Sequence, residues 1–445
     1  MPELIRKKKK MSSFEMIAFG FAGVILFGAI ILMLPISSSA GVVTPFDKTL
    51  FTATSAVCVT GLVVVDTGSY WSAFGQAVIL LLIQTGGLGV ITVVASFSMV
   101  SGRKISLMQR STMQDAISAP KVGGIVRLTK FILQGTFLIE LVGAILMLPV
   151  FCRDYGWKGI WMSVFHSVSA FCNAGFDILG TAGQTFPSLT GYIANPLINL
   201  VIMLLIVIGG IGFLTWDDFC TNKWNLKRYR LQSKIILVTT AVLILLPAIF
   251  FFLSDFAGFS MGKRILASLF QSVTLRTAGF NTADLGAMND SSKAIMTLMM
   301  LIGGSPGSTA GGMKTTTIAV LILNAFATFG REPETEVFGR RFDNTVVKNA
   351  ATIAILYFFL FFTGGIAISQ IEHVALSDCL FETASAVGTA GLTLGITTEL
   401  GLVSHLILVV LMYLGRVGGL TLIYAAISVK IQSGAKRPLD KITVG

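Results

Sequence analysis

Four segments of the chain repeat a pattern of one phenylalanine, a run of small residues and one glycine. In three of them the phenylalanine precedes the glycine by ten residues, and in the third copy along the chain it does so by nine. Glycine adopts backbone dihedrals that other residues avoid. Extended small segments can therefore turn carbonyl oxygens inward, where such oxygens replace the water shell of a dehydrated cation. The chemistry that this pattern predicts is cation coordination by backbone.

The residues expected to present these carbonyls are the three that end at each glycine. They are Val59, Thr60, Gly61, Asn173, Ala174, Gly175, Thr277, Ala278, Gly279, Thr389, Ala390 and Gly391. None is an Asp or Glu, so a divalent cation, which suits carboxylate-rich sites, is less favoured than potassium or sodium. The competing interpretation is four helix ends capped by glycine, a common event. The shared phenylalanine and matching flanks favour a true repeat.

Composition says what kind of molecule must position these segments. Of 445 residues, 54% are hydrophobic and only 12% are charged, against about 25% charged in soluble domains. This excludes a soluble multidomain protein and a disordered chain and indicates an integral protein of the lipid bilayer. The net charge of +11 would suggest nucleic acid in a soluble protein. Here it indicates the Lys/Arg excess of cytoplasmic loops, and no nucleic-acid partner is expected.

Long apolar stretches predict an all-α membrane protein with eight transmembrane helices, since about 20 consecutive apolar residues cross the hydrocarbon core of a bilayer. We expect spans at 14–35, 75–100, 130–151, 196–216, 233–253, 293–329, 350–371 and 402–430. Four shorter segments suit re-entrant helices, at 45–57, 159–171, 262–275 and 376–387.

The pattern divides into four pseudo-symmetric repeats of span, short helix, glycine turn and span. Their predicted limits are 1–102, 103–218, 219–330 and 331–445, and the third carries a broken second span. The short helices would point their C-terminal ends at a central axis. Each such end carries roughly −0.5 charge, which favours a cation.

Basic residues predict the orientation. With both termini cytoplasmic, 24 of the 33 Lys and Arg residues fall in inner segments and six in outer ones. This asymmetry agrees with the positive-inside rule. The basic residues at 6–10 precede the first apolar stretch. We therefore expect that stretch to be a membrane span of the protein and not a signal peptide that is cleaved off. Three basic residues at membrane depth are left unexplained by topology: Arg276, Lys314 and Arg416.

A glycine-rich stretch interrupts the sixth span. It comprises Gly303, Gly304, Ser305, Pro306, Gly307, Ser308, Thr309, Ala310, Gly311 and Gly312, and Lys314 follows closely. Non-helical backbone at membrane depth is tolerated where it lines a cavity or is buried in protein. A helix-packing kink is the alternative. A phosphate-binding loop is disfavoured because Lys314 lacks the required spacing.

Charged residues near the repeats suggest accessory roles. A buried arginine normally faces a cavity or a partner, so Arg416 either lines the pathway or is paired within helix packing. Arg276 would repel a cation, so we expect it behind the filter, braced by an acid such as Glu382 or Asp284. A further group lies just after the filter glycines, where it would concentrate cations or cap helices: Asp66, Asp177, Asp284 and Glu399.

Together these motifs resemble the Trk/Ktr/HKT superfamily of potassium transporters over nearly the whole chain. The length, without an additional N-terminal pair of spans, looks most like the bacterial Ktr-type membrane subunit. The resemblance implies potassium uptake across the plasma membrane, a carbonyl filter, and a gate formed by 303–312 with Lys314 and Arg416. It also implies a homodimer and a cytoplasmic nucleotide-binding regulatory ring. In sodium-favouring plant relatives a serine replaces the first filter glycine, so Gly61 implies potassium.

Other classes fit less well. No nucleophile–base pair or cofactor motif stands out, so we expect no enzyme and no organic cofactor, with sodium as a candidate activator. A membrane-embedded hydrolase lacks an acid–base constellation. The alternative that stays open is a sodium-coupled secondary cation symporter, because broken helices also suit that class. Four short-helix repeats argue against it, because alternating access usually uses two.

Overall fold

The computed structural model describes residues 12–100, 105–117 and 123–419, without the side chains of 97, 98 and 100. The protein is mostly helical, as predicted. Each of the four predicted repeats contains one long helix: α1 (Ser13–Met33), α7 (Ile125–Tyr155), α11 (Leu231–Leu253) and α15 (Asn344–Glu372). Ser12 and Glu15 form a reciprocal capping box that starts α1. Such a box satisfies two backbone donors that the first turn would leave free.

A short helix follows each long one. These are α2 (Phe46–Cys58), α8 (Lys158–Phe171), α12 (Met261–Thr274) and α16 (Leu376–Gly388). Their existence and bounds confirm the prediction to within a residue or two. The repeated phenylalanines, Phe51, Phe165, Phe270 and Phe381, are at most 1% exposed. Each anchors its short helix in the core by burying a large apolar ring.

The remaining elements include the helices that follow the filter segments and several connections. They are α3 (Thr67–Tyr70), α4 (Ala73–Leu88), α5 (Val90–Val100), α6 (Leu107–Ile117), α9 (Pro196–Gly210), α10 (Phe213–Asn222), α13 (Asp290–Met300), α14 (Thr315–Phe329) and α17 (Leu402–Val417). Strands β1 (Glu336–Val337) and β2 (Arg340–Arg341) form a small antiparallel hairpin. Short 3-10 turns lie at Pro35–Ser37, Thr190–Tyr192, Leu226–Arg228 and Ile396–Thr398.

The long helix of each repeat qualifies as a membrane span by itself, whereas the helices after the short helix are bent or shorter. Within 12–100, 105–117 and 123–419, α1, α7, α11 and α15 are long and apolar enough to cross a membrane, and six spans result if two bent pairs each count as one. The pairs α4 with α5 and α9 with α10 are each bent by 98°. The predicted spans 75–100 and 196–216 are therefore not straight helices. The last predicted span, 402–430, is described only as far as 419.

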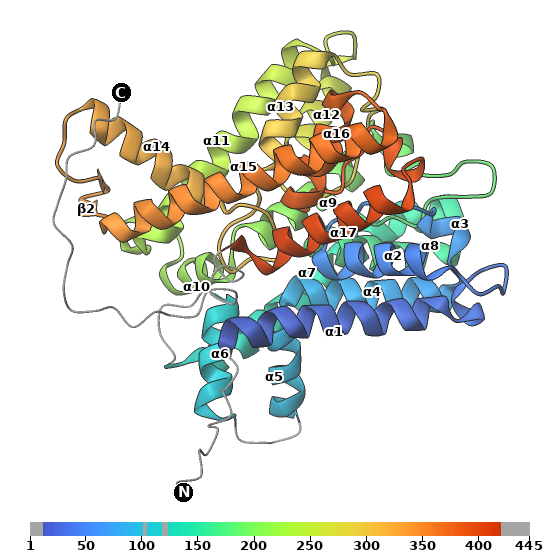
Figure 1. The fold of residues 1–445 in the computed structure, drawn as a ribbon, viewed down its shortest axis with the longest axis horizontal. Helices are drawn as coiled ribbons and strands as arrows, with labels where there is room; N and C mark the ends of the chain where they lie inside the picture. The colour runs from blue at the N-terminus through green and yellow to red at the C-terminus, as the bar shows by residue number, and fades with distance from the viewer. Residues whose placement is uncertain (1–11, 101–104, 118–122, 420–445) are drawn as a thin grey trace, which may run out of the picture.

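Helix packing follows one rule around the molecule. Each long helix packs on the short helix after it: α1 on α2, α7 on α8, α11 on α12 and α15 on α16. Each short helix also packs on a helix of the preceding repeat: α8 on α4, α12 on α9 and α16 on α13. Finally α2 packs on α17, so the last described helix lies beside the first repeat (Figure 1). These contacts form a closed cycle.

In Figure 1 the helices α1, α2, α4, α15 and α17 run broadly along one direction, whereas α5 and α6 run across it. The ends of α6, α10 and α14 and the β hairpin gather at one end, whereas α3 and the short helix α8 lie toward the other. Long helices expose apolar side chains on their outer faces, for example Phe19 and Phe27 of α1, which are 67% and 65% exposed. Such faces suit contact with lipid rather than water.

Candidate functional site

The four short helices end in the same unusual backbone turn. Val59, Asn173, Thr277 and Thr389 have φ angles of 57°, 59°, 61° and 52°. Two residues later, Gly61, Gly175, Gly279 and Gly391 have φ angles of 96°, 69°, 78° and 78°. Positive φ is rare for residues other than glycine and a genuine outlier for a β-branched one such as valine or threonine. Four copies of this left-handed turn in one chain make the repeat visible in the backbone.

The residue between the two strained positions is tied to its helix. The amides of Thr60, Ala174 and Ala390 donate to carbonyls five residues earlier, at 2.8, 2.7 and 2.7 Å. Ala278 instead donates to Thr274, four residues earlier, at 3.0 Å. The third copy has one residue fewer between its phenylalanine and its glycine, and this shorter hydrogen-bonded turn at the helix end accounts for the difference. Three segments thus leave their helix through the same bond, and the third copy does so through a bond one residue shorter.

The four glycines form a closed ring. A Cβ on Gly61 would meet the Ala174 carbonyl oxygen at 2.6 Å, and one on Gly175 would meet that of Ala278 at 2.8 Å. A Cβ on Gly279 would meet the Ala390 oxygen at 3.1 Å. A Cβ on Gly391 would collide with the Thr60 oxygen, which returns to the first segment. Each glycine therefore lies against the carbonyl of the next segment, and a side chain has no room.

The carbonyls of these segments have no internal partner. Within the part of the chain that the structure describes, none of the twelve carbonyl oxygens of 59–61, 173–175, 277–279 and 389–391 accepts a hydrogen bond. The twelve residues are buried. Buried backbone carbonyls are almost always paired. Buried carbonyl acceptors without a hydrogen-bond partner are chemically suited to a cation. That these residues coordinate one stays a prediction from the sequence.

A hollow of about 230 Å³ opens on one side of the ring. All four glycines line it, together with the carboxylates Asp66, Asp177 and Asp284. Three of the four acids predicted near the filter are thus brought together, whereas Glu399 does not line this hollow. Asp66 also has a structural role: its carboxylate accepts from the Ser69 amide at 2.8 Å and the Phe186 amide at 2.9 Å.

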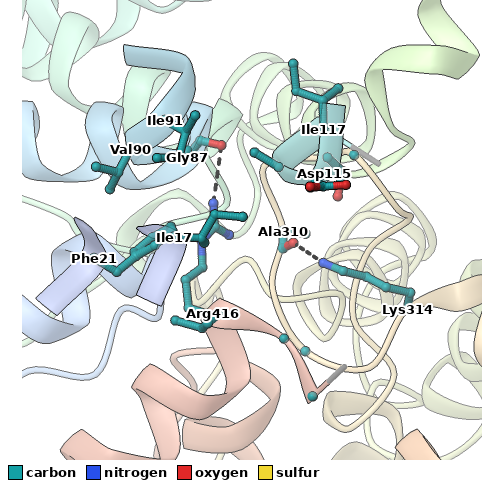
Figure 2. A pocket seen from close by; sticks show the side chains of 18 of the residues that line it. Ile17, Phe21, Gly87, Val90, Ile91, Asp115, Ile117, Ala310, Lys314 and Arg416 are labelled. Atoms are coloured by element: carbon teal, nitrogen blue, oxygen red, sulfur yellow. Dashed lines mark hydrogen bonds between the residues drawn. The ribbon is translucent and has the colours of Figure 1, made fainter. Parts of the chain in front are cut away.

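A second hollow of about 240 Å³ is lined by six of the twelve predicted gate residues: Gly307, Ser308, Ala310, Gly312, Lys314 and Arg416. Figure 2 shows the side chains that line it, from α1, the junction of α4 and α5, the end of α6, the glycine-rich segment and α17. Arg416 and Lys314 both reach into this space (Figure 2). The hollow therefore combines an apolar wall from Ile17 and Phe21 with the basic side chains of Lys314 and Arg416, and the acid Asp115 also lines it (Figure 2).

The segment 303–312 is an ordered loop that first closes on itself. The Gly303 amide donates to the Met313 carbonyl at 2.8 Å, and the Thr315 amide donates to that of Gly304 at 3.0 Å. Lys314 folds back, and its ammonium group donates to the Ala310 carbonyl at 2.7 Å. The helix break expected from Pro306 and the glycines is thus a defined loop.

The loop is also fastened to the second repeat. The amides of Ser305 and Thr309 donate to the carbonyls of Gly210 and Gly209, at 2.9 and 3.2 Å. In the opposite direction the Phe213 amide donates to the Gly307 carbonyl at 2.7 Å. One bond reaches the fourth repeat, from the Gly312 amide to the Gly415 carbonyl at 3.2 Å. The loop therefore lies in the glycine breaks of its neighbours.

Arg416 connects the loop to the first repeat. Its guanidinium donates to the carbonyls of Thr309, Gly86 and Gly87. Within the described residues no Asp or Glu lies within salt-bridge distance of it. The guanidinium is thus held by backbone oxygens rather than by a direct ion pair, although the acid Asp115 lines the same hollow.

The other three repeats break in one common way. Gly89, Gly212 and Gly418 have φ angles of 84°, 93° and 91° and ψ angles of 131°, 139° and 136°. Three residues earlier, the sites of Gly86, Gly209 and Gly415 leave no room for a Cβ, which would meet the carbonyls of Val57, Phe171 and Val387. Glycine is required there because a helix break approaches the short helix so closely.

The expected brace for Arg276 is wrong. Arg276 is buried, and its Nε and Nη2 atoms have no hydrogen-bond partner, nor does any described acid lie within 4.0 Å. Glu382 instead accepts bonds from Thr393, Leu394 and Thr397 in the loop after its own filter segment. Asp284 accepts from the Gly286 amide at 2.9 Å. Both acids are satisfied locally, so neither reaches the guanidinium.

Two polar contacts were missed from the sequence. The carboxyl of Glu140, in the middle of α7, is buried and accepts a hydrogen bond from the side-chain Nε2 of Gln84 at 3.3 Å. The side chain of Asn173 bridges the third repeat and the glycine-rich loop. An acid in the middle of an apolar span is a signal for the first. For Asn173 the sequence predicted a role of the backbone carbonyl and no role of the side chain.

Comparisons with known proteins agree with this geometry. Residues 24–435 match the TrkH family model, described as a cation transport protein. The chain is 36% identical to the potassium/sodium uptake protein NtpJ of Enterococcus hirae, over 99% of both chains. It is also 36% identical to the Ktr system potassium uptake protein B of Bacillus subtilis, over 97% of this chain and 96% of that one.

A solved structure shares the fold. The crystal structure of the potassium transporter TrkH from Vibrio parahaemolyticus matches with a TM-score of 0.74 at 18% identity. The match covers 95% of this chain and 86% of that one. The resemblance inferred from the sequence motifs is thereby confirmed, and with the apolar helices it indicates a multi-pass membrane protein. The chain belongs to the TrkH family of cation transport proteins.

Proposed function

We propose that this chain is the ion-translocating membrane subunit of a Ktr-type system that takes up potassium across the bacterial plasma membrane. The observation that carries the proposal is the ring of twelve buried carbonyls without hydrogen-bond partners, within the described chain. A monovalent cation that sheds its water needs such oxygens. The names of the two relatives, one a Ktr potassium uptake protein and one a potassium/sodium uptake protein, support the same function.

In this proposal the filter consists of 59–61, 173–175, 277–279 and 389–391, and potassium passes along their axis. The C-terminal ends of α2, α8, α12 and α16 lower the electrostatic energy of the ion, since helix C-termini carry partial negative charge. Cyclic packing of the short helices and the cyclic glycine contacts support four units around one pore. Such a pore has eight spans, with each second span broken, in the four repeats predicted from the sequence.

The gate is the loop 303–312 together with Lys314 and Arg416. Its ten residues occupy the neighbouring glycine breaks, and its carbonyls receive the arginine. Two basic groups beside the ion path oppose cations electrostatically. Opening then requires the loop to leave Gly209, Gly210 and Gly415, which costs several modest hydrogen bonds rather than one strong contact.

The biological assembly follows from the Ktr assignment. The chain forms a homodimer with one pore in each subunit, has both termini in the cytoplasm, and binds a cytoplasmic nucleotide-binding regulatory ring. The Lys/Arg excess of the inner segments supports this orientation. Potassium is the cargo, sodium is a candidate activator, and the mechanism needs no organic cofactor, no enzyme chemistry and no nucleic acid.

Rubidium uptake by proteoliposomes tests the proposal. Wild-type protein, with and without a regulatory partner, should pass rubidium and potassium down their gradients without a fixed ratio of sodium to rubidium, whether or not sodium raises the rate. An obligatory, fixed ratio of sodium to rubidium would instead support the symporter alternative, toward which the name of the Enterococcus hirae relative points. No flux of either ion under any of these conditions would overturn the function.

A further inference from the structure

One side chain joins the filter to the gate loop. Asn173 occupies the left-handed position of the second filter segment, where the other repeats have Val59, Thr277 and Thr389. Asparagine tolerates left-handed backbone better than most residues, which would be a sufficient reason for its presence. Yet β-branched residues take the same conformation in three repeats. The left-handed backbone therefore does not explain why this residue is an asparagine. The presence of its side-chain amide needs another explanation.

The amide is buried and both of its ends are bonded. Its Nδ2 donates to the Arg276 carbonyl at 3.2 Å, directly before the third filter segment. Its Oδ1 accepts from the Thr309 hydroxyl of the gate loop at 3.0 Å. This orientation of the amide is chemically required, because a carbonyl cannot donate and so must face the NH₂ group.

Thr309 is the best anchored residue of the loop. Its amide donates to the Gly209 carbonyl, its own carbonyl receives Arg416, and its hydroxyl also lies 3.0 Å from the Phe171 carbonyl. Any displacement of the loop from the neighbouring glycine breaks must therefore carry the hydroxyl away from Asn173. The Oδ1 atom would then be buried without a partner, which is unfavourable.

We propose that Asn173 makes cation selection depend on the position of the gate loop. With the loop seated, the Thr309 hydroxyl fixes the amide, and the amide in turn fixes the step between the second and third filter segments. With the loop displaced, the amide loses this restraint and the two segments separate more easily. Asn173 is thus a positioning residue, and discrimination between potassium and sodium falls when the loop is unseated. The inference rests on the proposed function.

The test compares Thr309→Val, which removes the hydroxyl and keeps the shape, with Thr309→Ser, which keeps the hydroxyl. The readout is the ratio of rubidium to sodium flux in proteoliposomes, which does not depend on how much active protein is present. Thr309→Val should lower the ratio by about three- to tenfold, as expected for one buried hydrogen bond. Thr309→Ser should restore it. Asn173→Ala should lower it similarly, and the double variant no further.

A matched control is Thr315→Val in the same part of the chain. The Thr315 hydroxyl pairs with that of Ser305 at 3.1 Å, and it makes no bond to a filter segment. This variant should leave the ratio unchanged even if the rate changes. An unchanged ratio in Thr309→Val, or additive effects of Asn173→Ala and Thr309→Val, would overturn the inference while leaving potassium transport intact.

The thermal stability of the four proteins of this cycle gives a readout that needs no transport. The two single variants should be coupled, so that the double variant melts close to the less stable single one. Additive shifts in melting temperature would mean that the two side chains do not act as a unit. Absence of rubidium flux in the wild type would remove the proposed function, and the selectivity role would be lost with it.

Discussion

The filter segments and the breaks of the second spans are both built from four copies, but only the filter keeps the copies alike. Each filter segment has a residue with left-handed backbone, an amide bond back to its helix, which is one residue shorter in the third copy, and a glycine two residues after the left-handed one. At the breaks, Gly89, Gly212 and Gly418 share one conformation, whereas the third repeat opens into the loop 303–312. Ion coordination needs equivalent ligands around an axis. Closing a pathway needs one element that differs.

The contact pattern gives the proposed gate a physical link to the other three repeats. The loop bonds to the breaks of the second and fourth repeats, and Arg416 adds a link to the first. Hence the three regular breaks, which we call the sockets, surround and hold the loop of the third repeat. We expect substitutions in the filter to disturb ion coordination directly. Substitutions in the sockets that unseat the loop should raise the rate and lower discrimination only through Asn173.

The largest effect is expected from Gly391→Ala. The left-handed backbone costs an L-residue roughly 1–2 kcal/mol, and the added methyl group collides with the Thr60 carbonyl of the neighbouring segment. Rubidium flux should fall by roughly a hundredfold, since the strain and the collision add. Gly395→Ala is the control, because its φ of 105° is equally strained but nothing lies within 4 Å of the new methyl group. Equal losses in both variants would contradict the ring.

Deleting 305–311 should come next and act in the opposite direction. The deletion removes the bonds to Gly209, Gly210 and Phe213 and takes away the Thr309 carbonyl that receives Arg416. Rubidium flux should rise about tenfold, the effect of removing a barrier of ~1.4 kcal/mol. The measurement is initial uptake rate per mole of reconstituted protein. A flux equal to or below wild type, in protein that elutes as a single species, would argue against the gate.

A pair of equivalent glycines separates the gate from generic strain. Gly212 and Gly89 have nearly the same φ, but a methyl group on Gly212 would lie 2.7 Å from the Pro306 carbonyl of the loop. On Gly89 the first neighbour is the Thr92 hydroxyl at 3.8 Å. Gly212→Ala should therefore raise flux about threefold by unseating the loop, at a cost of about one hydrogen bond. Gly89→Ala should not raise it. Parallel behaviour of the two variants would remove the distinction drawn between them.

The smallest effect is expected at the outer hollow. Asp284 is exposed there, and its carboxylate attracts cations through water. Asp284→Asn should raise the half-saturating rubidium concentration by about twofold at low ionic strength. The difference should vanish at high ionic strength, because salt screens exposed charges. A shift that persists in high salt would mean that Asp284 binds the ion directly.

Local rules predicted much of this structure. The short helices and filter glycines follow from apolar length, small-residue runs and the dihedral freedom of glycine, all of which are written in neighbouring residues. The 98° bends were not predicted, because Gly86-Gly87-Leu88-Gly89 suggests only a mild kink until the neighbouring short helix is in place.

Long-range polar pairing was harder to foresee. The Arg276 brace was wrong because Glu382 finds donors within its own repeat, at Thr393, Leu394 and Thr397. The Asn173 bridge joins residues 103 and 136 positions apart. No sequence period links such positions, so only the folded arrangement of the repeats brings them together.

The central claim is that backbone carbonyls of four equivalent segments select the ion. The most direct test is the ratio of rubidium to sodium flux in proteoliposomes for the wild type and Gly61→Ser. The Gly61 site has a φ of 96°, and a Cβ there would lie 2.6 Å from the Ala174 carbonyl oxygen. The serine should therefore displace this ligand and lower the ratio strongly, with sodium flux retained. A ratio unchanged by the serine would contradict selection by this ring of carbonyls.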